Sequence, residues 1–394
     1  MAHPSLFDTI GNAELTQVCR DLVRINTVNP PGDELAAAVY VSEYLAPYGF
    51  ESELIAQGDG RATAIARLRG SGSVPALMLN GHVDVVPVGL EPWIYPPFAG
   101  TVADGKVWGR GAADMKGGVA AQLVAAKAVA LAGLPLAGDL IVTATAGEEV
   151  DMSGAKALVE TACLGPLQAI IVAEPTHNRL GLAERGVFQP EFTTYGKTAH
   201  GSTPELGQNA ITMMLELLRE LRELEIPYTP HPVLGRFTTN IGTIHGGIKV
   251  NVVPDRCTAM VDMRTVPGQD HAALLAQLEG LLAALSERLP GFRATVRHTY
   301  DLPAVETPVD APAVKRFSAA VLQATGKPVQ LVTVRFATEG AIFVPALAVP
   351  TLILGPGDPD LAHQPNENVE IARMAEAARI YAAAAAELLS QDTP

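Results

Sequence analysis

The chain has 394 residues, which exceeds the usual size of one domain and predicts two or three domains. Hydrophobic residues make up 48% of the chain and charged residues 18%, a composition that excludes an intrinsically disordered protein. The formal net charge of −14 repels phosphate backbones and anionic lipid headgroups, so we expect neither a nucleic acid nor a membrane as a partner.

Cysteine usage and the N-terminal segment indicate where the protein works. The three cysteines, Cys19, Cys163 and Cys257, are odd in number and widely spaced, which argues against a disulfide framework or a cysteine-based zinc site. The first residues lack a basic stretch followed by an apolar one, and no apolar run reaches the length needed to span a bilayer. We therefore expect a cytoplasmic protein.

The two outer parts of the chain alternate helical and strand patterns. Helices are predicted over 12–28, 33–47, 114–133 and 311–325, with an Ala-rich helix at the C-terminal end. Strands are predicted over 61–68, 76–86, 139–146, 168–174 and 351–354. This alternation predicts an α/β layer sandwich, and continuous apolar runs such as AIIV predict strands buried on both faces.

The middle of the chain follows a different pattern. Strands are predicted over 187–196, 236–246, 257–266 and 294–300, and helices over 203–224 and 270–289. The resulting order, βαββαβ, is that of a ferredoxin-like domain. We therefore expect a domain at 186–298 inserted into a discontinuous domain formed by 1–185 and 299–394.

Candidate metal ligands follow several predicted strands. His82 and Asp84 end the run ALMLNGHVDVV two residues apart, so strand alternation places both side chains on one face. The imidazole can bind a metal ion and the carboxylate can orient it, although an isolated H-x-D pair proves little. Asp114 stands at the start of the helix predicted over 114–133, where an ordinary first-turn acid that interacts with the helix dipole is the alternative.

More acids and a histidine recur at comparable positions. TATAGEEVD carries the adjacent acids Glu148 and Glu149, which form either a solvated loop or a metal ligand beside a general base. Glu174 ends the strand IIVAEPT, and His363 lies in a turn-rich loop after TLIL. Open α/β sheets place their sites at the C-terminal ends of strands, and these ligand types suit a pair of zinc-like ions bridged by a carboxylate.

Five ordered segments, GHVDVVP, GRGAADMKGG, TAGEEVD, VAEPT and AHQPNE, resemble the metal-site segments of the M20 metallopeptidase and amidohydrolase family. The resemblance covers nearly the whole chain. It implies a zinc-peptidase-like α/β/α catalytic domain with an inserted lid and dimerisation domain. It also implies two divalent ions per chain, with Zn²⁺ as the expected ion and Co²⁺ as a substitute.

The resemblance assigns a role to each residue of these segments. One ion would be held by His82 and Glu174, and the other by Glu149 and His363. Asp114 would bridge the two ions. Asp84 would orient a ligand, and Glu148 would act as the general base.

The inserted domain carries further matches. GKTAHGSTPELGQNAI resembles the family segment whose histidine, here His200, reaches across a homodimer and polarises the scissile carbonyl. NIGTIHGGIKVNVVPD and DMRTVPG resemble the segments that supply Asn251 and Arg264 to the substrate carboxylate. From the residues alone, a surface histidine, a turn-forming asparagine and a solvated arginine remain open.

The segment RFATEGAIF, with Thr338 and Glu339, resembles acetylornithine deacetylases more than desuccinylases. An extra carboxylate near the pocket favours a cationic side chain, so we expect an N-acyl-amino-acid deacylase of acetylornithine type. The alternatives are a succinyl-diaminopimelate desuccinylase and an M20 dipeptidase or carboxypeptidase, all acting on a small N-acyl amino acid or dipeptide. A two-domain small-molecule binding protein is the non-enzymatic alternative, but it would not need Glu148 beside a ligand.

Overall fold

The computed structural model describes residues 5–161 and 163–390, and the chain forms two compact units. Unit 1 contains the chain up to Leu182, Glu306–Thr333 and the chain from Thr338 onwards. Unit 2 contains Ala183–Val305 and Val334–Ala337. Unit 2 thus continues past residue 298, the end expected for the insert, because its last strand runs on to Leu302.

Unit 1 is built on a mixed sheet with the strand order β1-β2-β6-β3-β7-β15-β8-β13, and β14 pairs with β8. The strands are β1 Glu51–Ala56, β2 Ala62–Leu68, β3 Ala76–His82, β6 Leu140–Thr145, β7 Leu167–Val172, β8 Leu180–Glu184, β13 Val305–Glu306, β14 Leu331–Val334 and β15 Thr351–Ile353. β6, β3, β7 and β15 are parallel neighbours, so their C-terminal ends meet at one edge of the sheet.

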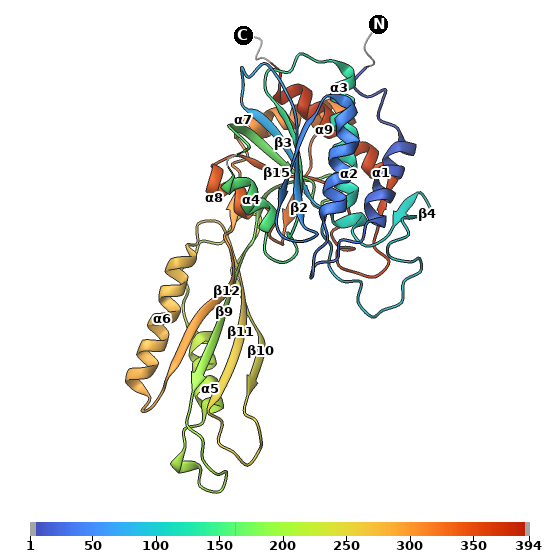
Figure 1. The fold of residues 1–394 in the computed structure, drawn as a ribbon. Helices are drawn as coiled ribbons and strands as arrows, with labels where there is room; N and C mark the ends of the chain where they lie inside the picture. The colour runs from blue at the N-terminus through green and yellow to red at the C-terminus, as the bar shows by residue number, and fades with distance from the viewer. Residues whose placement is uncertain (1–4, 162, 391–394) are drawn as a thin grey trace. The chain divides into compact units, whose positions relative to one another are not determined.

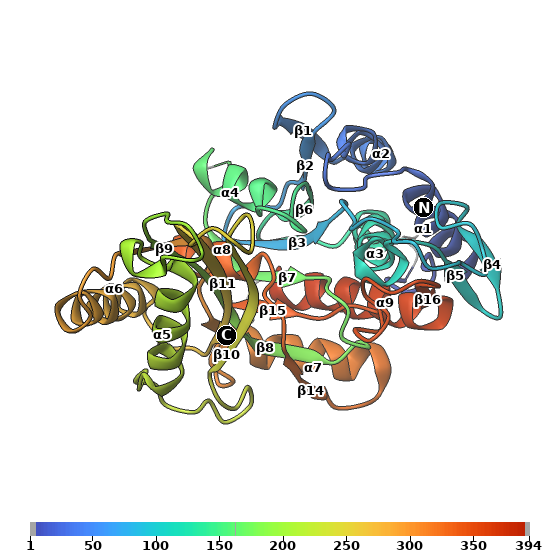
Figure 2. The same cartoon turned by 90° about the horizontal axis from the view of Figure 1, so that it is seen from below.

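Helices cover both faces of this sheet (Figures 1 and 2). On one face lie α1 Asn12–Arg24, α2 Leu35–Leu45, α3 Gly117–Ala132, α7 Pro312–Thr325 and α9 Ile371–Leu388. On the other lie α4 Ser153–Glu160 and α8 Gly340–Leu347. The central strands are buried on both faces, as their continuous apolar sequences predict, and the expected α/β sandwich is confirmed.

The segment Ala112–Ala132, which includes α3, is long and apolar enough to cross a membrane by length and composition. The expectation that no apolar run reaches this length is therefore wrong. Its apolar character has a different physical reason, because 83% of the most apolar window is buried inside the protein. The small alanine side chains of α3 and α9 let these two helices pack closely in the core.

Unit 2 has the element order βαββαβ. Its elements are β9 Gly186–Tyr195, α5 Ala210–Glu223, β10 Thr238–Gly246, β11 Arg256–Thr265, α6 His271–Arg288 and β12 Ala294–Leu302. The strands form an antiparallel sheet in the order β10-β11-β9-β12. Alternate residues of β11 are buried and pack with α5 and α6 in a separate core.

The sequence patterns miss several short elements. A second small sheet of unit 1 joins β4 Thr101–Ala103, β5 Lys106–Trp108 and β16 Asn368–Glu370, and strands of this length have too few residues to show a period. The helix predicted from residue 203 begins at Ala210, because the Asn209 side chain accepts the backbone N–H groups of Ile211 and Thr212.

Candidate metal centre

His82 is the last residue of β3, and its imidazole is held from both sides. Nδ1 lies 3.0 Å from the backbone oxygen of Asp84, so the proton on Nδ1 can be donated to that oxygen. Nε2 lies 3.1 Å from Oδ1 of Asp114. An imidazole that donates from Nδ1 presents the lone pair of Nε2, which is the form that binds a metal ion.

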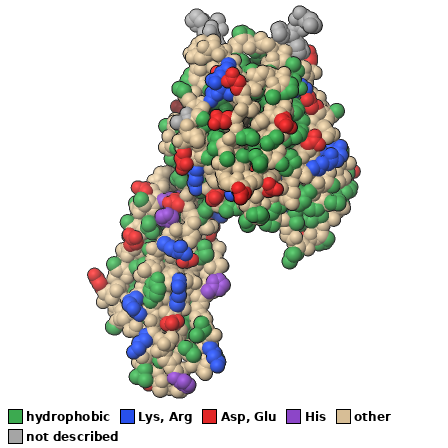
Figure 3. Space-filling view, viewed as in Figure 1, with side chains coloured by type: hydrophobic (Ala, Val, Ile, Leu, Met, Phe, Trp, Pro, Cys, Tyr) green, Lys and Arg blue, Asp and Glu red, His purple; other side chains and the backbone are tan. Residues whose placement is uncertain are grey.

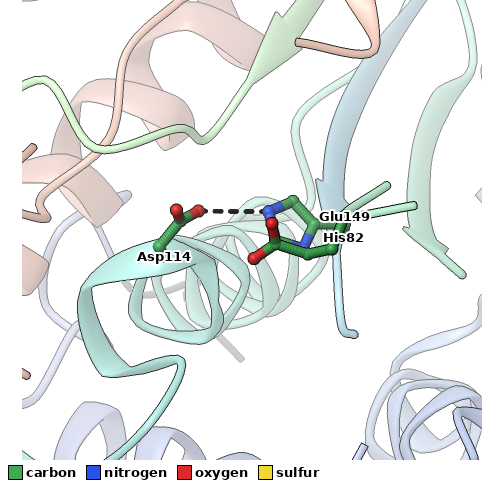
Figure 4. A group of neighbouring side chains, drawn as sticks. All are labelled: His82, Asp114 and Glu149. Atoms are coloured by element: carbon green, nitrogen blue, oxygen red, sulfur yellow. Dashed lines mark hydrogen bonds and ion pairs between the residues drawn. The ribbon is translucent and has the colours of Figure 1, made fainter. Parts of the chain in front are cut away.

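Asp114 comes from the turn that precedes α3 (Figure 4). Its backbone is not helical, with φ −125° and ψ 96°, and the carboxylate points toward His82. Oδ1 faces His82, and Oδ2 lies 3.5 Å from Nε2 of His363. The two oxygens of one carboxylate thus face two different imidazoles.

The adjacent acids Glu148 and Glu149 lie in the turn after β6. Oε2 of Glu149 lies 3.0 Å from Nε2 of His363, whereas Oε2 of Glu148 lies 3.9 Å from Nε2 of His82. Their backbone N–H groups both donate to the carboxylate of Asp84. The two neighbouring acids therefore face different imidazoles.

Glu174 and His363 complete the cluster. Glu174 follows β7, is buried, and places Oε1 3.9 Å from Nε2 of His82. His363 lies between β15 and β16, in the left-handed backbone region with φ 64°, and half of its side chain is exposed. A non-glycine residue in this region costs conformational energy, a cost that proteins often place at functional sites.

This cluster holds more acidic side chains than histidines, and the crowding shifts their pKa values. Burial lowers the pKa of His82, but its hydrogen bonds to Asp114 and Asp84 outweigh that effect and raise the pKa well above the usual value. Burial raises the pKa of Glu148 well above its usual range, against the attraction of His82 and with added repulsion from Glu174.

Other carboxylates show the same crowding. Burial and the charge of Asp114 raise the pKa of Glu174 well above its usual range. Burial also raises the pKa of Glu149, although its hydrogen bond to His363 opposes the shift. Crowded buried carboxylates of this kind are relieved by a cation.

The donor set fits divalent metal ions. Ligand atoms of His82, Asp114 and Glu149 all lie within 4.8 Å of one another (Figure 4). Imidazole nitrogen and carboxylate oxygen are ligands of Zn²⁺ and similar ions. The exposure of His363 beside this group leaves one side of the cluster open to solvent.

Several supporting residues were not recognised in the sequence. Asn29 donates from Nδ2 to Oδ2 of Asp84 at 2.9 Å. Glu367 accepts the backbone N–H groups of Ala113 and Asp114. Glu367 is the last residue of the segment AHQPNE, which resembles the M20 family. Nothing else in the sequence indicated its role, because its contacts join residues far apart in the chain.

Thr338 and Glu339, predicted to bind substrate, are both buried. The hydroxyl of Thr338 accepts the backbone N–H of Gly340 at the start of α8. Oε2 of Glu339 accepts hydrogen bonds from Asn80 (2.5 Å) and Thr145 (2.8 Å), while Oε1 has no hydrogen-bond partner in the described part of the chain. Burial raises the pKa of Glu339 to about 7.

The remaining predicted residues belong to unit 2. His200 is exposed, and its Nδ1 accepts the backbone N–H of Ser202 at 3.1 Å, so a neutral ring carries its proton on Nε2. The backbone N–H of Gly201 donates to the backbone oxygen of Asn251 at 2.8 Å, so the segments that contain His200 and Asn251 lie side by side. Arg264 pairs with Asp262 at 2.9 Å.

Residues 78–387 match the model of peptidase family M20/M25/M40, and the chain belongs to this family. It is therefore a hydrolytic enzyme, as the order of the five segments predicted. The matched range includes all six side chains of the cluster, His82, Asp114, Glu148, Glu149, Glu174 and His363.

Individual relatives agree with this membership. A probable succinyl-diaminopimelate desuccinylase of Staphylococcus epidermidis is 29% identical over 390 residues, which cover 91% of this chain and 93% of the relative. An aminopeptidase PepT of Bacillus cereus has a similar fold, with a TM-score of 0.79, 20% identity and coverage of 97% and 100% of the two chains. A dinuclear metal-binding M20 peptidase of Bacillus subtilis has a TM-score of 0.72 at 16% identity, covering 96% and 98%.

Proposed function

We propose that this protein is a dinuclear-metal hydrolase that cleaves the amide bond of N-acyl amino acids. The observation that carries the proposal is the cluster of two histidines and four carboxylates at the ends of β3, β6 and β7 and in the adjoining loops. The described dinuclear metal binding of the Bacillus subtilis M20 peptidase supports a pair of ions here.

The distances support a division of ligands between the two ions. We assign His82 and Glu174 to one ion and Glu149 and His363 to the other, with Zn²⁺ as the expected metal and Co²⁺ as a substitute. Asp114 is assigned as the bridge, because each of its oxygens faces a different imidazole.

When bound, the two ions would lower the pKa of a water molecule and polarise the substrate carbonyl. Glu148 would accept the proton of the attacking water and later return it to the departing amine. Burial raises the pKa of this carboxyl group, which favours its protonated form before the proton is returned to the amine. The Nε2–H of His200 would donate a hydrogen bond to the developing oxyanion.

We further propose a homodimer formed through unit 2, in which His200 serves the active site of the partner copy. The edge strand β10 is exposed along its whole length, including Ile241 and Ile244. An open edge strand is a template for pairing with a second chain. The face of unit 2 in Figure 3 also carries exposed hydrophobic side chains among its charged ones.

Two substrate classes compete. The resemblance of the Thr338–Glu339 segment favours an acetylornithine-type substrate, but the burial of Glu339 weakens the argument for a cationic side chain. A succinyl substrate is the second candidate, because the Staphylococcus epidermidis relative is named a probable succinyl-diaminopimelate desuccinylase.

The direct test is hydrolysis of a matched substrate panel by the metal-loaded protein. N-acetylornithine, N-succinyl-diaminopimelate and a dipeptide would be compared by kcat/KM at one pH and metal concentration. The proposal predicts that an N-acyl amino acid is cleaved at least ten times more efficiently than the dipeptide. Preference for the dipeptide would contradict it, and the ratio of acetyl to succinyl substrates decides between the two classes.

A further inference from the structure

Arg110 and Glu367 form a buried ion pair beside the metal centre. Nη1 of Arg110 lies 2.7 Å from Oε2 of Glu367, and the side chains are 2% and 0% exposed. The residues are far apart in the sequence and are brought together by pairing of β5 with β16. Taking two charges out of water is costly, so a pair in this position needs further hydrogen bonds to be stable.

Glu367 uses both of its oxygens to hold the turn that carries Asp114. Oε2 accepts the backbone N–H of Gly111 at 3.0 Å. Oε1 accepts the backbone N–H groups of Ala113 at 2.8 Å and Asp114 at 3.0 Å. Since the Asp114 backbone is not helical, these bonds replace the intrahelical bonds that would otherwise fix the turn.

Arg110 connects the same carboxylate to two other loops. Its guanidinium donates to the backbone oxygens of His363 (3.4 Å) and Gln364 (3.3 Å), both in the loop that supplies the second imidazole. It also donates to the backbone oxygen of Pro87, in the loop that follows His82, at 3.3 Å. The planar fork of arginine can serve several acceptors at once, which the single ammonium group of lysine does less well.

We infer that the Arg110–Glu367 pair is a positioning element of the metal centre. It fixes three loops against one another, those of His82, Asp114 and His363, so that the Asp114 carboxylate faces both imidazoles. This inference rests on the proposed two-metal function. Neither residue is assigned as a ligand, and the pair acts only through the backbone of the segments that hold the ligands.

A purely structural ion pair would stabilise the fold without affecting metal affinity. Asp139 offers a matched control at the opposite end of β6. Its carboxylate pairs with Arg67 at 3.0 Å and accepts the backbone N–H of Gly70 at 2.9 Å, but it contacts no residue of the metal centre. Glu367→Gln and Asp139→Asn each remove one negative charge and place an amide where backbone N–H groups point.

The experiment compares metal binding and unfolding of the metal-free proteins. Zn²⁺ affinity would be measured by competition with a chromogenic chelator, and unfolding by circular dichroism. Glu367→Gln is expected to bind Zn²⁺ about 10–100-fold more weakly, the usual effect of losing a partner behind the ligands. Asp139→Asn is expected to unfold at a lower temperature while its Zn²⁺ affinity stays within about threefold of wild type. Amide exchange at Ala113 and Asp114 should be faster only in Glu367→Gln.

A second variant covers the case in which Glu367→Gln does not fold. Arg110→Lys keeps the positive charge beside Glu367 but loses the fork to His363 and Pro87, so it too is expected to weaken Zn²⁺ binding. Folded Arg110→Lys or Glu367→Gln protein that binds two Zn²⁺ ions as tightly as wild type would overturn the inference alone. A wild-type protein that binds no divalent ion would overturn the proposed function and the inference with it.

Discussion

The carboxylate of Asp84 accepts the backbone N–H of Glu148 at 3.1 Å. The same side chain also accepts the backbone N–H of Glu149 and the side-chain amide of Asn29. Burial alone would raise the pKa of Asp84, but its interactions with His82 lower it. One ionised carboxylate therefore ties the imidazole at the end of β3 to the turn that bears both acids.

Asp84→Asn should lower kcat and Zn²⁺ affinity by about 10–100-fold each, because an amide cannot accept hydrogen bonds at both of its terminal atoms. Steady-state kinetics and chelator competition measure the two effects. Asp151→Asn is the control, since Asp151 is an exposed acid close to Glu149 whose carboxylate accepts the backbone N–H of Ser153. Equal behaviour of the two variants would refute a special role for Asp84.

Glu148→Ala should lower turnover by about 10²–10⁴-fold or more, because the proposed base acts in both proton transfers. Elemental analysis should still find two ions per chain. Glu149→Ala, the neighbouring change, should instead lose metal, since Glu149 lies beside His363. Near-normal turnover in Glu148→Ala would mean that the roles of the two acids are assigned wrongly.

Chelation should remove two divalent ions per chain and abolish activity, and Zn²⁺ or Co²⁺ should restore it. Because the ions bind the folded state, their removal should also lower the unfolding temperature. Each ion adds about 4 kcal/mol of stability when free metal is 1,000 times its Kd. Elemental analysis and calorimetry give the two readouts. Full activity without stoichiometric transition metal would contradict the two-metal proposal.

Mixing inactive His200→Ala protein with inactive Glu148→Ala protein should partly restore activity if His200 serves the partner copy. Some mixed dimers then contain one site with an intact Glu148 and a His200 from the other subunit. In a same-chain arrangement every site would lack one group. The measurement is activity after demonstrated subunit exchange, and either continued inactivity or a monomeric active enzyme would contradict the shared site.

Stability of the metal-free protein should carry a pH-dependent contribution from Glu339. Its pKa in the folded state, about 7, lies above its ordinary value of 4.5, so the folded state binds more protons between these values. Stability from this group is present below pH 4.5 and is lost as pH rises toward 7, by up to about 3 kcal/mol.

Glu339→Gln removes this titration and keeps an acceptor for Asn80 and Thr145. The variant should therefore gain stability relative to wild type as pH rises from 5 to 8, which urea unfolding at each pH measures. A difference that stays constant with pH would show that Glu339 has an ordinary pKa in the folded protein.

The sequence by itself determined the class of fold and the positions of the candidate ligands. Buried parallel strands read as continuous apolar runs, and the chain must leave each strand at the same edge of the sheet. Acids and histidines directly after these runs therefore converge, as His82 and Glu174 do. The βαββαβ pattern of the middle segment was readable for a similar reason, because one face of each element is apolar.

Only the tertiary structure decided how the site is held. Contacts such as Arg110 to Glu367 or Asn80 to Glu339 join residues hundreds of positions apart, and local periodicity carries no information about them. The short strands β5 and β16 that align the first pair show no pattern of their own. The burial of Glu339 was also decided by the tertiary structure. The sequence predicted that its carboxylate binds substrate, but packing buries it against Asn80 of β3 and Thr145 of β6.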